Sequence, residues 1–224
     1  MREIYTEESE RPVVRQYLRI GEQAPAFTAR TTMGVKSLDD YRGKWLVLFS
    51  HPADFTPVCT SEFIAFENAA KEFRRRDCEL LGLSVDSIFA HLAWMQNIED
   101  KFGVAISFPI IEDLSMVIAE AYGMINESST STATVRSAFF IDPDGIVRAL
   151  VHYPMTVGRS VDEILRVLCA LQATAEDNLA APEGWKPGER LLKAPPITID
   201  SMKRRLSADV GEQAKDWYYS EALE

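Results

Sequence analysis

The chain has 224 residues, a mass of 25.2 kDa and a formal net charge of −10 at neutral pH. This length predicts one or two domains with a substantial buried core. The acidic balance argues against a nucleic-acid backbone or an anionic membrane as the main partner. The apolar run Trp45–Phe49 is too short to span a bilayer, and Met1–Glu8 lacks the basic and apolar regions of a signal peptide.

The three cysteines, Cys59, Cys78 and Cys169, are too few and odd in number for a closed disulfide framework. Such a low cysteine content is typical of a reducing compartment, so we expect a cytoplasmic protein. The role of each cysteine therefore has to be judged from its local surroundings.

The first part of the chain reads as an arm followed by strands and helices in turn. Residues 1–17 are charged and aperiodic and are expected to form an N-terminal arm. The apolar run Lys44–Phe49 predicts a buried strand, and Glu79–Val85 predicts a second one. Between them, apolar residues recur every three or four positions, which indicates an amphipathic helix from Thr56 to Arg75. A further helix over Ser87–Phe102 begins at a serine cap.

The second part predicts a hairpin between helices. A short helix is expected over Ser115–Tyr122. Two apolar segments, Ser137–Ile141 and Ile146–His152, flank the turn sequence Asp142–Gly145 and predict a β-hairpin. Ser160 then caps a helix whose leucines recur on one face. With a short strand between the second and third helices, this order predicts an α/β fold with a mixed sheet flanked by helices.

The composition changes in the last quarter of the chain. Four of the 11 prolines lie within 182–196, which predicts an extended segment. The remainder is charged but contains the aromatic run Trp217–Tyr219, which must pack against something. We therefore divide the chain into the arm 1–17, a compact domain over 18–174 and a C-terminal extension over 175–224.

The segment between the first strand and the first helix carries the strongest chemical signal. Cys59 falls in the first turn of the predicted helix, where unpaired backbone N–H groups and the positive end of the helix dipole stabilise a thiolate. The hydroxyl of Thr56 could donate to the sulfur and accept from another group, while Pro52 and Pro57 stiffen and shield the loop. A free cysteine is more often a small buried apolar residue, but this loop favours a reactive one.

The spacing Pro52-x-x-x-Thr56-x-x-Cys59 resembles the active-site signature of the peroxiredoxins. The longer run from His51 to Glu62 resembles the one-cysteine-type subfamily, which includes archaeal and bacterial members of the AhpC/TSA-like group. Further segments resemble the family in the same order: 78–87, 136–145, 153–159 and 185–188. The resemblance covers nearly the whole chain.

The resemblance implies a thioredoxin-like fold and a thiol-dependent peroxidase that reduces hydrogen peroxide and organic hydroperoxides in antioxidant defence. Cys59 would be the peroxidatic cysteine, which becomes a sulfenic acid when it attacks the peroxide. Thr56 and the backbone N–H of Cys59 would hold the peroxide oxygens, and Pro52 would close the pocket from water. Arg136 would place its guanidinium against the thiolate and polarise the O–O bond. The resemblance implies no metal or organic cofactor.

Two further residues are implied by the same resemblance. Arg159 would be a second cation of the pocket, and His51 would orient the peroxide. Without the motif, either Arg136 or Arg159 would be read as an ordinary surface arginine. The three histidines, His51, His91 and His152, show no spacing typical of a metal site, and His91 is expected on a helix surface.

The other cysteines bear on how the sulfenic acid is reduced. Cys78 opens a predicted strand and Cys169 lies on a predicted helix, so core packing is the expected role of both. Related archaeal proteins carry two cysteines beside an aromatic C-terminal segment, but here Ala214 and Ser220 occupy the apparent positions. This departure predicts a one-cysteine cycle in which an external thiol, a thioredoxin-like protein or a small thiol, reduces Cys59.

Two other functions stand as alternatives. A peroxide sensor or chaperone-like scaffold would depend on a large oligomer and would react slowly with peroxide. A thioredoxin-like disulfide reductase would need a C-x-x-C pair, whereas Cys59 is followed by Thr60 and Ser61. The resemblance further implies a homodimer in which the C-terminal extension wraps the partner, with a decamer of five dimers as a further option.

Overall fold

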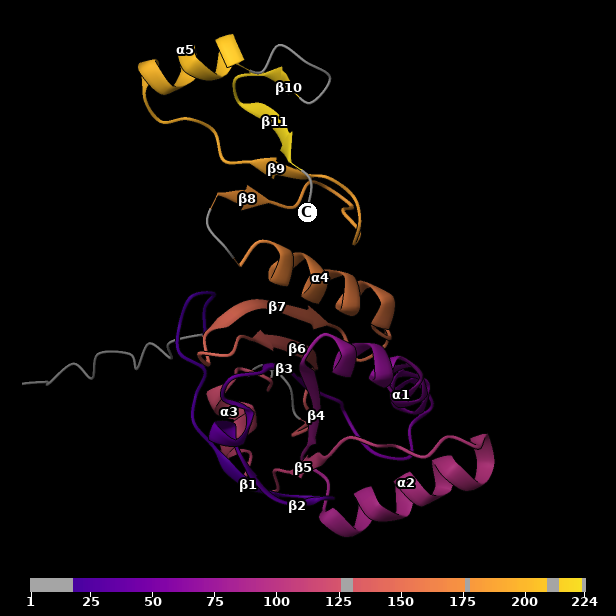
Figure 1. Ribbon diagram of the computed structural model, residues 1–224. Helices are drawn as coiled ribbons and strands as arrows, with labels where there is room; N and C mark the ends of the chain where they lie inside the picture. The colour runs from indigo at the N-terminus through magenta and orange to yellow at the C-terminus, as the bar shows by residue number, and fades with distance from the viewer. Residues whose placement is uncertain (1–17, 126–130, 176–177, 209–213, 223–224) are drawn as a thin grey trace, which may run out of the picture.

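The computed structural model describes residues 18–125, 131–175, 178–208 and 214–222. The N-terminal arm expected for residues 1–17 lies outside this part of the chain. No helix within the described ranges is long and apolar enough to cross a membrane. Figure 1 shows a domain built around a sheet and a C-terminal extension that projects from one end of it.

The domain is organised around one seven-stranded mixed sheet. Its strands are β1 Thr28–Thr31, β2 Gly34–Ser37, β3 Trp45–Ser50, β4 Cys78–Ser84, β5 Ile110–Glu112, β6 Arg136–Ile141 and β7 Val147–Tyr153. The order across the sheet is β2-β1-β5-β4-β3-β6-β7. Strands β3, β4 and β5 run parallel, as strands joined by helices do, while β6 and β7 form the predicted antiparallel hairpin at one edge.

The central strand β3 is buried on both faces. All six of its residues are buried, and successive side chains point to opposite faces of the sheet. Trp45, Val47 and Phe49 enter one core cluster, whereas Leu46 and Leu48 enter the other. The predicted strand is therefore confirmed, and its C-terminal end delivers the chain into the loop that carries the motif residues.

Helices cover both faces of this sheet. They are α1 Pro57–Arg75, α2 Ile88–Phe102, α3 Val117–Ala121 and α4 Val161–Ala173, with a short 3₁₀ helix at Leu38–Tyr41. Apolar residues of α1, α2 and α4 share one cluster with β3, and those of α3 join the opposite cluster. The side chains of Ser87 and Ser160 cap α2 and α4, as predicted, and Gly103 ends α2 at a φ of 68°.

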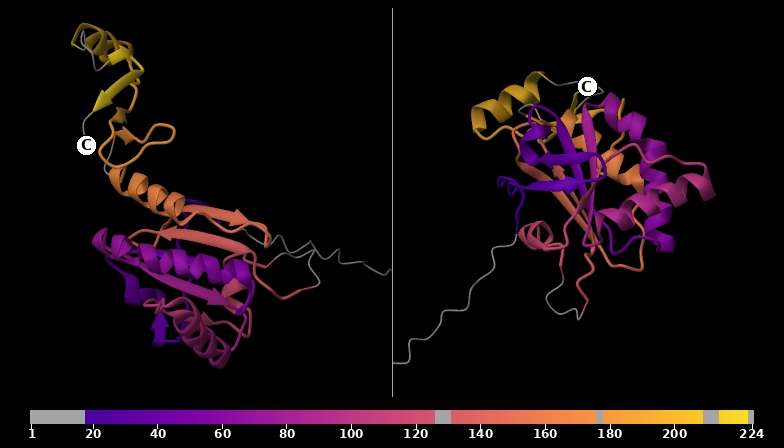
Figure 2. Two further views of the ribbon diagram at one scale, coloured as in Figure 1. Left: turned by 90° about the vertical axis from the view of Figure 1, so that its right-hand side faces the viewer. Right: turned by 90° about the horizontal axis from the view of Figure 1, so that it is seen from below.

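In its described residues, the C-terminal extension contains a small four-stranded sheet and one helix. Its elements are β8 Leu179–Ala180, β9 Leu191–Lys193, α5 Ile199–Ala208, β10 Ala214–Asp216 and β11 Tyr219–Ala222. Figures 1 and 2 show these elements beyond α4 and away from the central sheet. Trp185, only 1% exposed, anchors the extension to α4 by packing with Cys169 and Leu191.

Candidate active site

The loop after β3 ends at the first turn of α1. Thr56 is the N-cap of this helix, Pro57 is its first residue, and Cys59 lies two residues further on. The side chain of Cys59 is fully buried, at 0% exposure. The first-turn N–H groups of a helix have no intrahelical acceptors, so they leave partial positive charge beside the sulfur. The predicted position of Cys59 in the first helical turn is confirmed.

Arg136 brings a full positive charge to the same sulfur. It is the first residue of β6, is 2% exposed, and donates from Nη1 to Cys59 Sγ over 3.3 Å. Its Nε donates to the carbonyl oxygen of Met155 at 2.9 Å, so two contacts fix the guanidinium plane. Pairing of β6 with β3 brings this strand end beside the helix that follows β3. The predicted position is confirmed, and the surface-arginine reading is wrong for Arg136.

Glu62 joins the two arginines. Its carboxylate accepts from Arg136 Nη1 at 2.7 Å, from Nε and Nη2 of Arg159 at 2.9 Å each, and from the backbone N–H of Arg159 at 2.7 Å. Burial would raise the pKa of Glu62, but the hydrogen bonds and charges of the arginines outweigh burial and hold the pKa below its ordinary value. The motif contains Glu62, but sequence reasoning assigns it no role. The available signal was its position one turn after Cys59.

Arg159 lies behind this carboxylate. Its Nη1 donates to the carbonyl oxygen of Ser137 at 2.6 Å, and its guanidinium carbon lies 5.4 Å and 5.7 Å from the ring centres of Phe49 and Phe66. The side chain is 0% exposed, which a cation tolerates because Glu62 neutralises it. Arg159 is therefore not a surface arginine. Its partner, Glu62, is the same carboxylate that contacts Arg136.

The loop between β3 and α1 is held by its own hydrogen bonds. The Thr56 hydroxyl donates to the carbonyl oxygen of Ala53 at 2.9 Å. Its single hydrogen is thus engaged, and the expectation that it donates to the sulfur is wrong; its oxygen is left to accept from a ligand. Pro52 is buried, and His51, at 0% exposure, hydrogen-bonds through Nε2 to Asp54 at 2.8 Å.

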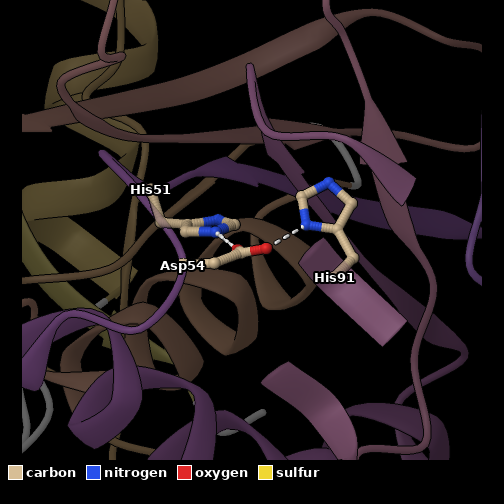
Figure 3. A group of neighbouring side chains, drawn as sticks. All are labelled: His51, Asp54 and His91. Carbon is tan, nitrogen blue, oxygen red and sulfur yellow. Dashed lines mark hydrogen bonds and ion pairs between the residues drawn. The ribbon is translucent and has the colours of Figure 1, made fainter. Parts of the chain in front are cut away.

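His91 is buried, and the expectation of a helix-surface position is wrong. Its side chain is 0% exposed, with Nδ1 2.7 Å from Asp54 Oδ2 and Nε2 3.2 Å from the carbonyl oxygen of Ile111. Figure 3 shows the Asp54 carboxylate between the imidazoles of His51 and His91. His91 is buried because it lies one helical turn after Ile88, on the face of α2 that packs against the domain.

These three side chains also bring metal-ligand atom types within 4.8 Å of one another, a convergence that the linear spacing of the histidines does not suggest. In each imidazole, however, the nitrogen that faces the carboxylate is already hydrogen-bonded to it. Hydrogen bonding between His51, Asp54 and His91 therefore accounts for the cluster.

Cys78 and Cys169 are buried, at 1% and 4% exposure, and neither forms a disulfide within the described part of the chain. Burial raises the pKa of Cys78 far above its ordinary value, which keeps the group a thiol. Cys169 packs against Trp185 at the base of the extension. Core packing, the role predicted for both residues, is confirmed.

The junction of β3 and α1 thus suits one kind of chemistry. A sulfur that faces a guanidinium and a helix N-terminus is stabilised as the thiolate, which is the nucleophilic form. The same groups stabilise negative charge that develops on an oxygen beside the sulfur. Cys59 and Arg136 are therefore arranged for nucleophilic attack on an electrophilic oxygen.

Comparisons with known proteins agree with this geometry. Residues 20–150 match the AhpC/TSA family, and residues 170–208 match the C-terminal domain of 1-Cys peroxiredoxin. A peroxiredoxin of Methanosarcina mazei is 45% identical over 207 residues, covering 89% of this chain and 94% of the relative. Peroxiredoxin 2 of Caldanaerobacter subterraneus is 50% identical over 200 residues, covering 89% and 90% of the two chains.

Solved structures share the thioredoxin-like fold and the extension. A yeast mitochondrial 1-Cys peroxiredoxin, described as resolved via glutathione/thioredoxin systems, has a TM-score of 0.81 at 38% identity over 92% of this chain and 100% of its own. A cysteine-to-serine mutant of peroxiredoxin 6 of Arenicola marina has a TM-score of 0.76 at 36% identity over 84% and 88%. With the family match across most of its length, the chain belongs to the peroxiredoxin family and is a thiol-dependent peroxidase.

Proposed function

We propose that Cys59 is the peroxidatic cysteine of this peroxidase. The observation that carries the proposal is the 3.3 Å contact of Arg136 Nη1 with the buried sulfur at the start of α1. The thiolate attacks the terminal oxygen of the hydroperoxide, so that an S–O bond forms as the O–O bond breaks. The electron pair of the broken bond leaves on the other oxygen, which takes up a proton and departs as water or an alcohol. Cys59 is left as a sulfenic acid.

Arg136, Thr56 and Pro52 form the peroxide pocket beside Cys59 in this proposal. Arg136 stabilises negative charge as it moves from the sulfur to the departing oxygen. The oxygen of Thr56 accepts from the peroxide O–H, since its own hydrogen is engaged within the loop. The buried ring of Pro52 keeps water out of the pocket.

His51 and Arg159 complete the set. His51 orients the peroxide from the loop that leads into α1. Arg159 acts through Glu62, because the carboxylate that it holds is the one that also holds Arg136. It is therefore proposed as a positioning residue of the binding pocket.

We propose that an external thiol returns the sulfenic acid to the thiol. Cys78 and Cys169 are buried in the core, which supports a cycle with one working cysteine. Ala214 and Ser220 are directly paired across the β10–β11 hairpin, but neither carries sulfur. The yeast 1-Cys relative is described with glutathione and thioredoxin systems, so both are the first reductants to test here.

The C-terminal extension, 175–224, is proposed as the dimerisation element of a peroxidase domain over 18–174. Its support is the set of apolar side chains that the extension leaves exposed: Ile197 at 96%, Ile199 at 68%, Tyr218 at 56% and Leu206 at 50%. A partner subunit would cover them, and a decamer is the larger assembly considered. Light scattering decides between these sizes, and a stable monomer would contradict the proposal.

A reducing cytoplasm is the proposed compartment, since none of the three cysteines, all of which lie in described residues, forms a disulfide. The test of the catalytic proposal is a steady-state peroxidase assay with thioredoxin, glutathione and a small dithiol in turn. We expect Cys59→Ser to abolish turnover and Cys78→Ser, the matched control, to retain it. Turnover by Cys59→Ser would overturn the assignment, and a correctly folded wild type that reacts slowly with peroxide would favour a sensor.

A further inference from the structure

The carboxylate of Asp54 fixes the tautomer of His51. Oδ1 of Asp54 lies 2.8 Å from Nε2 of His51, and Oδ2 lies 2.7 Å from Nδ1 of His91 (Figure 3). The three side chains are at most 2% exposed, so water does not compete for these bonds. An ionised carboxylate can only accept. His51 therefore carries its hydrogen on Nε2, and its Nδ1 is a bare lone pair.

His91 faces an acceptor on each side. Its Nδ1 meets the carboxylate of Asp54, and its Nε2 lies 3.2 Å from the carbonyl oxygen of Ile111, which cannot donate. Burial raises the pKa of Asp54, but the hydrogen bonds from both histidines outweigh burial and hold the pKa below its ordinary value. Asp54 therefore stays an ionised acceptor, and Nδ1 of His91 donates to it.

Two other carboxylates face this cluster. Asp86 accepts from the backbone N–H of Asp54 at 3.0 Å. Glu112 accepts from the backbone N–H of Ile88 at 2.9 Å, one helical turn before His91. Both place negative charge near the imidazoles. The remaining neighbours of the His51 ring are aromatic, and burial lowers the pKa of His51, which keeps that ring neutral.

The Nδ1 of His51 is buried and has no hydrogen-bond partner within the described part of the chain. The ring of His51 packs edge-on against the ring of Phe63, with the two ring centres 4.8 Å apart. It also stacks on the ring of Trp94, with a distance of 5.2 Å between the ring centres. Phe63 lies one turn after Cys59 on α1, and Trp94 Nε1 donates to Thr60 Oγ1 at 3.2 Å. The ring of His51 therefore packs on the helical turn that carries the proposed nucleophile. A buried lone pair without a donor is costly, and a ligand with an O–H group would satisfy it.

We propose that Asp54 and His91 are positioning residues that keep Nδ1 of His51 a hydrogen-bond acceptor for the O–H of the hydroperoxide at Cys59. The inference rests on the proposed role of Cys59. It also bears on the substrate class: hydrogen peroxide carries two O–H groups, one for Thr56 and one for Nδ1 of His51, whereas an alkyl hydroperoxide carries one and a dialkyl peroxide none. Loss of the His91 hydrogen bond leaves Oδ2 of Asp54 without its donor, so that Asp54 can hold a proton and donate it to Nε2. The hydrogen of His51 then moves to Nδ1, which becomes a donor.

The first test measures the tautomers directly. The chain has only three histidines, so the ring nitrogens can be followed by ¹⁵N NMR in the full-length Cys59→Ser protein, where no oxidation interferes. At neutral pH we expect His51 with hydrogen on Nε2 alone and His91 with hydrogen on Nδ1, the nitrogen that faces Asp54. A hydrogen on Nδ1 of His51, or a bare Nδ1 on His91, would overturn the proposal.

The second test measures the rate constant of sulfenic acid formation as a function of pH, in protein that retains Cys59. Asp54→Asn and His91→Gln are each expected to lower it by about tenfold, the effect of one lost hydrogen bond, and to change the pH profile. Leu92→Ala, on the exposed face of the same helix, is the matched control and should change neither. Wild-type rates and profiles in both folded variants would overturn the proposal.

The outcomes for Cys59 and for the histidines can be told apart. Peroxidase turnover by Cys59→Ser would remove the nucleophile from the account, whereas the NMR signals of His51 and His91 would remain readable. Conversely, a Cys59-dependent enzyme with the other His51 tautomer would leave the proposed nucleophile in place and remove only the positioning role of Asp54 and His91.

Discussion

Cys59 and Glu62 share one nitrogen of Arg136: its Nη1 lies 3.3 Å from the sulfur and 2.7 Å from the carboxylate. The carboxylate holds the guanidinium in place, and Arg159 binds the same carboxylate from behind. Two cations and one anion leave a net positive charge beside the sulfur. Because the group is buried, this charge is little screened by water.

Replacing Arg136 with methionine removes the charge beside the sulfur. We expect the second-order rate constant of Cys59 with hydrogen peroxide to fall by about a hundredfold, the typical effect of losing one preorganised donor to transition-state charge. Stopped-flow measurement of Cys59 oxidation checks this. The matched control is Arg148→Met. Arg148 lies on the half-exposed strand β7 and forms its ion pair with Asp142. Equal rates for the two variants would contradict the role of Arg136.

Replacing Glu62 with glutamine leaves two buried arginines without their anion. Breaking a buried ion pair on one side typically costs about 3 kcal/mol, so the free energy of unfolding should drop by that order. Urea denaturation followed by circular dichroism measures it. Glu163→Gln, which breaks an exposed pair with Arg166, should lower stability by less than about 1 kcal/mol. If both variants lost a similar amount of unfolding free energy, the buried ion pairs of Glu62 would contribute no more to stability than the exposed pair of Glu163.

Stability should also depend on pH through Glu62. Its pKa in the folded protein is held below the ordinary value, so ionised Glu62 stabilises the fold fully above that ordinary value. The contribution is lost as the pH falls through the lowered pKa. Wild-type unfolding free energy should therefore decrease more steeply than that of Glu62→Gln as the pH is lowered from neutral into the acid range. Parallel curves for the two proteins would contradict this assignment.

Trp185 carries the attachment of the C-terminal extension. Its ring is 1% exposed, and its Nε1 donates to the carbonyl oxygen of Glu189 at 3.0 Å. Trp185→Ala should lower the free energy of unfolding by about 3 kcal/mol, as for other large-to-small changes in a core. The half-buried Trp217 provides the control, and Trp217→Ala should cost less. Differential scanning calorimetry compares them, and equal stability would contradict the anchoring role of Trp185.

Much of the domain could be predicted because its signals are local. The apolar run of β3 and the helical periodicity of α1 place Cys59 at a helix start, and the turn after Ile141 predicts the β6–β7 hairpin. By contrast, the sequence does not predict the β1–β2 hairpin or α5. Ile199, Met202 and Leu206 recur at helical spacing within α5, but they are few and lie in a charged segment that also carries Lys203 and Arg204.

The side-chain network of the site was harder to predict. Glu62 and His91 each lie on a buried helical stripe, beside Phe63 and Trp94 respectively. A polar residue on such a stripe requires buried partners, and those partners come from segments far away in the chain: Arg159 lies 97 residues after Glu62, and Asp54 lies 37 residues before His91. Single-sequence patterns give helix faces but not the strand pairing that brings those partners together.

Only one of the three cysteines should form a sulfenic acid. Cys78 and Cys169 are buried in the core, and the raised pKa of Cys78 keeps it in the unreactive thiol form. After one equivalent of peroxide, the Cys78→Ser/Cys169→Ser double variant should therefore oxidise as fast as the wild type. Slow oxidation of this variant would implicate a second cysteine.

The most direct test of the account is intact-mass and peptide analysis of the wild type under non-reducing conditions after one equivalent of hydrogen peroxide. We predict a gain of one oxygen atom, located on Cys59 by trapping of the sulfenic acid, and full return to the starting mass on addition of an external thiol. A disulfide between Cys59 and either Cys78 or Cys169, or an added oxygen located away from Cys59, would contradict the account.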